Sequence, residues 1–120
     1  MALENVMTHN PYEPPREEAM LLSEVIPDVA AELAQGLLLE SRPELAAQVA
    51  ELRLANRCRC HDSFCASFAT EAIEPWPDSA ERIICPMRGL SAVFAVDGRI
   101  VYVELLNRPE VRARLLELLP

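Results

Sequence analysis

Two apolar runs that flank Asp97-Gly98 constrain the fold of this chain more than any other feature. Residues 90–96 and 99–105 are rich in the β-branched and aromatic side chains that are typical of strands. An Asp-Gly pair readily adopts the two positive-φ conformations of a type I′ turn, so the segment predicts a β-hairpin. Direct pairing across the turn puts three pairs of residues opposite one another: Phe94 and Val101, Ala92 and Val103, and Leu90 and Leu105.

The two faces of this hairpin are both apolar. We expect the face with the six paired residues to pack against helices. The other face carries Val93, Ala95, Ile100 and Tyr102, and is too apolar to be fully solvated. Another element or a second copy of the protein must cover it, so a homodimer is one expectation.

Helical signals lie on both sides of the hairpin. Apolar residues recur at helical spacing in 29–37, 45–52 and 111–119. Pro27 restarts the first helix, since proline has no amide hydrogen to donate but fits a first turn. The run Ser41-Arg42-Pro43-Glu44 matches a capping box, and residues 107–110 repeat it with asparagine in place of serine. A further strand is expected at 82–85, followed by Pro86.

These segments predict one α+β domain. We expect N-terminal helices, an antiparallel sheet of four to five strands built from two hairpins, and a C-terminal helix packed on the sheet. A chain of 120 residues is long enough for one such domain. Residues 16–120 would form it, while residues 1–15, with three prolines and few apolar anchors, would form an extended or disordered arm.

The charge of the chain narrows the classes of partner. The net charge is −8, which argues against nucleic acid, because nucleic-acid binding needs a basic face. The sequence has no apolar run of about 18 residues and no cationic start, so neither a membrane helix nor a secretory leader is expected. We therefore expect a cytoplasmic protein with reduced thiols.

Cys58, Cys60 and Cys65 lie close together in the sequence, beside His61 and Asp62, whereas Cys85 stands apart. Such thiols can bind a metal ion, take part in redox chemistry, or fill a core as small apolar side chains. Residues 52–60 and 64–71 predict a second hairpin around the turn at 61–63. Its register decides which of these roles the thiols can have, because a slip of one residue exchanges the faces of a strand.

Two registers are open for this hairpin. A three-residue turn puts Cys60 opposite Phe64, places Phe64 and Phe68 on the apolar face, and sends Cys65 to the other face. A four-residue turn puts Cys60 opposite Cys65 and brings the three thiols together, but moves both phenylalanines to the side of the arginines. Burial of a phenylalanine contributes roughly 2–3 kcal/mol, so we favour the three-residue turn and ordinary free thiols.

The alternatives are a metal site and a reactive thiol. The spacing C-x-C-H-x3-C differs from the paired C-x2-C motifs of zinc proteins. Zinc could nevertheless be coordinated by Cys58, Cys60 and Cys65, with either His61 or Cys85 as the fourth ligand. Two flanking arginines would lower the pKa of Cys58 and favour a redox sensor or thiol enzyme. His61 and Asp62 are interpreted as turn residues and not as a catalytic pair.

No hydrolase, phosphate-loop, dinucleotide or H-E-x-x-H motif occurs in the sequence. We therefore expect a non-enzymatic protein-binding or regulatory domain that acts on a protein partner, without nucleic acid or membrane. A structural zinc module and a thiol-based redox sensor or enzyme are the alternative functions.

The run Arg57-Cys58-Arg59-Cys60-His61-Asp62-Ser63-Phe64-Cys65-Ala66-Ser67-Phe68, preceded by 43–49, resembles a set of small bacterial proteins with no established activity. Their pattern has glycine after the second cysteine, then aspartate, a strand like Phe-Cys-Ala-Thr-Phe, and a closing Asp-Gly-Arg-Ile-Val hairpin. The resemblance covers residues 27–117 and implies a bacterial origin and the fold, but no function. His61 replaces the glycine, which argues against a strictly positive-φ turn and favours the metal alternative.

Overall fold

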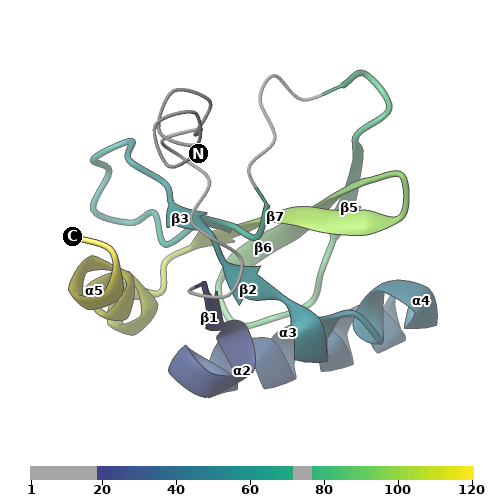
Figure 1. The fold of residues 1–120 in the computed structure, drawn as a ribbon, viewed down its shortest axis with the longest axis horizontal. Helices are drawn as coiled ribbons and strands as arrows, with labels where there is room; N and C mark the ends of the chain where they lie inside the picture. Colours follow the sequence, from purple (N-terminus) through teal and green to yellow (C-terminus); the bar gives the residue numbers. More distant parts are fainter. Residues whose placement is uncertain (1–18, 72–76) are drawn as a thin grey trace, which may run out of the picture.

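The computed structural model describes residues 19–71 and 77–120, and its centre is an antiparallel five-stranded sheet (Figure 1). The strand order is β3-β4-β7-β6-β5. These strands are β3 (Asn56–Arg57), β4 (Phe68–Ala69), β5 (Glu81–Ile84), β6 (Leu90–Val96) and β7 (Arg99–Leu106). A small second sheet pairs β1 (Met20–Leu21) with β2 (Arg53–Leu54). The predicted arm at 1–15 lies outside the described residues.

The helices are arranged around this sheet as the α+β prediction requires, which confirms the fold class. Helices α2–α4 lie along one face of the sheet, and α5 lies at the end of the sheet near β3 (Figure 1). Within 19–71 and 77–120, no helix has the length and apolar character needed to cross a membrane. The helices are α2 (Leu22–Val25), α3 (Pro27–Leu39), α4 (Pro43–Ala46) and α5 (Pro109–Leu118), with a 3₁₀ turn at Val49–Glu51.

Proline begins α3, α4 and α5, as the sequence predicts, but the capping boxes are wrong. Ser41 and Asn107 adopt φ values of 61° and 63°, and the following arginine takes the cap position without a capping side chain. The residue before a proline is driven out of the helical region, so the serine is too far from the helix to cap it.

Arg42 and Arg108, the arginines at these cap positions, instead form ion pairs with glutamates. The Nε atom of Arg108 donates to Glu110 at 2.8 Å, and its two terminal nitrogens donate to Glu32 of α3 at 2.9 and 3.0 Å. The Arg108 side chain is only 4% exposed. This buried pairing ties the start of α5 to α3. Arg42 makes the same pattern nearer to solvent, with Glu44 and Glu81.

The β6–β7 hairpin has the predicted turn but only part of the predicted register. Asp97 and Gly98 both have positive φ, at 51° and 76°. The pairing Ala95–Ile100 follows the prediction, but the next pair is Phe94–Tyr102, so Val101 is an extra residue. This β-bulge makes the predicted pairing of Phe94 with Val101 wrong.

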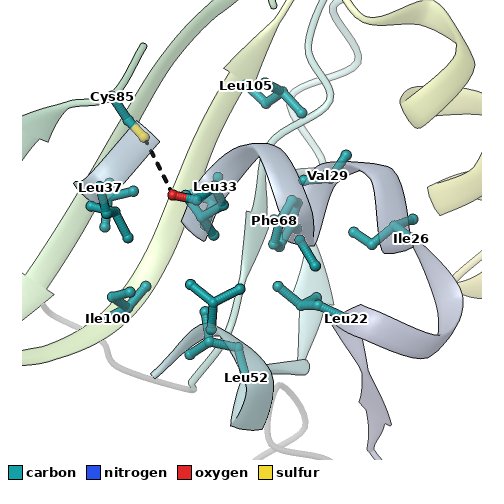
Figure 2. Close-up of a cluster of buried hydrophobic side chains, with 14 of the residues drawn as sticks. Leu22, Ile26, Val29, Leu33, Leu37, Leu52, Phe68, Cys85, Ile100 and Leu105 are labelled. Carbon is teal, nitrogen blue, oxygen red and sulfur yellow. Dashed lines mark hydrogen bonds between the residues drawn. The ribbon is translucent and has the colours of Figure 1, made fainter. Parts of the chain in front are cut away.

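The bulge also exchanges the two faces beyond it. Val93, Ala95 and Ile100, which we expected on the face away from the helices, belong to the core cluster that includes α3. Val103 and Leu105 beyond the bulge belong to it as well, so on β7 the core-facing residues pass from one predicted face to the other at the bulge. Figure 2 shows Ile100 and Leu105 facing Leu33 and Leu37 of α3. A homodimer stays a prediction.

Helix α3 comes unusually close to β5 because Gly36 has no side chain. A Cβ atom at Gly36 would lie 2.6 Å from the Cys85 sulfur and 2.9 Å from the Pro86 carbonyl oxygen. Cys85 is 2% exposed, and its thiol donates to the Leu33 carbonyl at 3.9 Å (Figure 2). Cys85 is therefore a core thiol at the β5 edge of the sheet, the edge opposite β3.

Candidate metal centre

The hairpin that carries the cysteines has the register of a four-residue turn. Asn56 pairs with Ala69 and Arg57 with Phe68, and the Cys58 amide donates to the Ser67 carbonyl at 2.9 Å. Extended toward the turn, this register sets Cys60 opposite Cys65. The three-residue turn that we favoured is therefore wrong.

The aromatic argument failed because the predicted strand at 52–60 is broken. Leu54 ends β2 in one sheet and Asn56 begins β3 in another, so the alternation of faces does not pass through Ala55. Phe68 is fully buried through its pairing with Val103 of β7, whichever register β3 takes. Phe64 remains 49% exposed.

The three clustered sulfurs converge. The Sγ atoms of Cys58, Cys60 and Cys65 all lie within 4.8 Å of one another. Thiolates in a tetrahedral zinc site, each about 2.3 Å from the ion, stand roughly 3.8 Å apart. A closure of about 1 Å would bring these sulfurs to that geometry. Cys58 and Cys65 are half-buried and Cys60 is exposed, so an ion can reach them from solvent.

Backbone amides of the turn support two of the sulfurs. The amide of Cys60 hydrogen-bonds to the Cys58 sulfur, and the amide of Asp62 to the Cys60 sulfur. Such N–H donors stabilise a thiolate and orient a metal ligand. His61, between them, has a φ of 70°, so the expectation against a positive φ at this position is wrong. The Cys65 amide closes the turn onto the Asp62 carbonyl at 3.2 Å.

The electrostatics of the cluster favour ionisation of Cys58. Burial opposes its ionisation, but hydrogen bonds from the Tyr102 hydroxyl, the Cys60 amide and the two neighbouring thiols outweigh burial and lower the pKa of Cys58. The flanking arginines are not the cause. Arg57 and Arg59 point instead to the end of the chain, where they donate to the Leu119 and Pro120 carbonyls.

Cys60 behaves in the opposite way. The Asp62 amide acts to lower its pKa, but its hydrogen bond with Cys58, its partial desolvation and the Cys65 thiol together raise the pKa of Cys60 to about 11. The first thiolate therefore forms at Cys58 and makes the second harder to form. A cation at the centre of the cluster would remove this obstacle, because it stabilises all three thiolates at once.

The cluster has a closed side and an open side. On the closed side, Tyr102 of β7 contacts Cys58. The Cys65 thiol donates at 3.4 Å to the hydroxyl of Ser67, a buried residue at the floor of the open side. The sequence placed Tyr102 away from the helices but gave no sign that it would meet Cys58, because that contact depends on the pairing of β3 with β4 and of β4 with β7. The open side is a pocket of about 90 Å³ whose lining, besides the three cysteines, includes Arg57, His61, Asp62, Arg112, Leu115 and Leu116.

The structure separates the residues that the sequence proposed as ligands. His61 lines the pocket, but within the described ranges its ring nitrogens are not part of the group that lies within 4.8 Å. Cys85 is buried under α3 at the other edge of the sheet and does not approach the cluster. Of the proposed ligands, the three clustered cysteines are therefore the ones that the described part of the chain brings close enough together to hold a metal ion.

Comparison with protein-family models, with curated proteins and with solved structures found no match for this chain. The fold and the site alone define its class, an α+β domain with a solvent-accessible cluster of three cysteines that can hold a metal ion.

Proposed function

We propose that this protein is a metal-binding module that holds zinc through Cys58, Cys60 and Cys65. The observation that carries the proposal is the convergence of three sulfurs from the two sides of one turn. Cys58 and Cys60 come from the outgoing chain and Cys65 from the returning chain. A bound ion would therefore tie together the two sides of a segment that has little apolar anchoring of its own.

The contrast with Cys85 supports a ligand role for the cluster. Burial and, to a smaller extent, the negative charge of Glu40 raise the pKa of the Cys85 thiol to about 11, as expected for a thiol that fills a core. The clustered thiols are half-buried or exposed, and those of Cys58 and Cys60 accept hydrogen bonds from backbone amides. The pKa of Cys58 is lowered, and that of Cys60, which the Asp62 amide acts to lower, is raised mainly by its hydrogen bond with Cys58 and not by burial in a core. Zinc suits such a site because it binds thiolates and has no redox chemistry of its own.

A reactive-thiol function is a second candidate, favoured by the lowered pKa of Cys58 beside two other thiols. The protein-binding role that we expected from the sequence is compatible with a zinc module. Of the residues that suggested a covering partner, Val93, Ala95 and Ile100 lie in the core cluster. A protein partner stays a prediction.

Metal analysis tests the proposal directly. Protein purified under reducing conditions without chelator should contain about one zinc ion per chain, as measured by inductively coupled plasma mass spectrometry. Cys58→Ser, Cys60→Ser and Cys65→Ser should each lose most of that zinc, whereas Cys85→Ala, the matched control, should keep it. A protein that neither carries zinc nor takes it up on titration would refute the proposal.

Maleimide labelling separates the two candidates. In a zinc module, bound zinc should protect the three clustered thiols, and removal of zinc should expose them. If Cys58 reacts rapidly in protein that never binds zinc, the reactive-thiol function is the correct one.

A further inference from the structure

We infer that the metal ion keeps its fourth coordination position open to the pocket, where it binds a small external thiol that carries a carboxylate. This inference rests on the proposed zinc site and names a ligand for it. The ligand's thiol would lose its proton to solvent, and its sulfur would displace water from the ion. No electron is transferred in this step.

The ligand count indicates an open position. Zinc is almost always four-coordinate, and three protein ligands with one exchangeable position is the arrangement of sites that bind external ligands. Across 19–71 and 77–120, no imidazole nitrogen or carboxylate oxygen joins the three sulfurs within 4.8 Å. All three cysteines line the pocket, and Tyr102, which contacts Cys58, is not among the lining residues, so an ion at the centre of the cluster would present its free position to the pocket.

The size of the pocket limits the ligand. Its volume is about 90 Å³. Pockets that take drug-sized ligands measure about 300–1,000 Å³, so this pocket limits the ligand to a small molecule. Leu115 and Leu116 of α5 form an apolar wall that suits a short hydrocarbon linker.

The chemistry of the walls indicates the two ends of the ligand. A soft site of three thiolates favours sulfur as a further donor. Arg112 lines the same pocket, and its Nε donates to the Asp62 carbonyl at 3.3 Å. Among the described residues, its two terminal nitrogens have no hydrogen-bond partner, and guanidinium nitrogens pair best with a carboxylate. A single ligand with a thiol at one end and a carboxylate at the other could bind the ion and Arg112 at the same time.

Cobalt-loaded protein gives the test, because the visible spectrum of Co²⁺ reports its ligands. Mercaptoacetate should change the spectrum and saturate at one molecule per chain. It should bind about tenfold more tightly than 2-mercaptoethanol, which lacks the carboxylate, and acetate should have no effect. Arg112→Gln should abolish this preference and leave both the cobalt content and the binding of 2-mercaptoethanol unchanged.

The histidines provide the control for an open position. His61→Ala, and His9→Ala outside the described residues, should leave the cobalt spectrum as it is before ligand is added. A changed spectrum in either variant would show that a histidine occupies the fourth position, and would overturn the inference. Stripping of cobalt by mercaptoacetate, or a spectrum that does not respond to it, would also overturn it. Failure to bind cobalt or zinc at all would instead refute the proposed metal site.

Discussion

Substitution of Gly36 by alanine tests the packing of α3 against the sheet. Gly36 is buried within α3, where an alanine would ordinarily be the better helix former. In this structure the added Cβ would lie 2.6 Å from the Cys85 sulfur and 2.9 Å from the Pro86 carbonyl oxygen. The second contact is with backbone, so the helix or the strand must move. Helix propensity therefore predicts that Gly36→Ala stabilises the fold, whereas tertiary packing predicts that it destabilises the fold.

The magnitudes decide between these two effects. Replacing a helical glycine by alanine stabilises by about 1 kcal/mol. Forcing an extra carbon into a well-packed interior costs about 1–3 kcal/mol, and here two heavy atoms stand in its way. Because two close contacts place the cost in the upper part of that range, about 2–3 kcal/mol, we expect Gly36→Ala to lower the free energy of unfolding by about 1–2 kcal/mol.

Urea unfolding followed by far-UV circular dichroism measures this change. The Cys85→Ala background serves as the matched test, because it removes the sulfur but keeps the Pro86 carbonyl. On that background Gly36→Ala should cost less, with a coupling of about 0.5–1 kcal/mol. A Gly36→Ala protein that is more stable than the parent would refute the close approach of α3 to β5.

Two further predictions concern charge. Arg108→Met removes the main cation of the partly exposed Glu32, which keeps the longer ion pair with Arg88 at 3.4 Å, and should destabilise the fold by about 2–3 kcal/mol in urea unfolding at pH 7. Burial acts to raise the pKa of Glu32, but hydrogen bonds with Arg108 and the Arg88 amide outweigh it and lower the pKa. The pair therefore stabilises the fold fully above the ordinary carboxyl pKa, near 4.5, and the difference between parent and variant should shrink as pH falls below that value. A difference that stays constant down to pH 3 would contradict this account. Zinc affinity should rise with pH, because the pKa of Cys60 is about 11 and its proton must leave when the ion binds. Competition with a chelator at pH 6, 7 and 8 should show that the affinity for zinc rises at least about tenfold per pH unit. An affinity that does not change with pH would count against Cys60 as a ligand.

The amino-acid sequence was sufficient wherever neighbouring residues decide the conformation. Asp97-Gly98 forms the expected turn because both residues tolerate positive φ. Pro27, Pro43 and Pro109 begin helices because their φ is already helical. The α+β class follows from such local signals, and so does the grouping of three cysteines around one turn.

The tertiary structure decided which of those cysteines meet. Val101 forms a β-bulge in β7, and the chain leaves one sheet for another at Ala55. After each of these two irregularities, the side chains that follow lie on a different face from the one that simple alternation predicts. Both depend on partners far away in the chain, as when Phe68 is buried by its pairing with Val103. Side chains of a strand alternate between two faces, so a shift of one residue sets whether sulfurs converge or separate. Residues near in sequence could not determine that shift, because it is stabilised by contacts that exist only after the sheet has assembled.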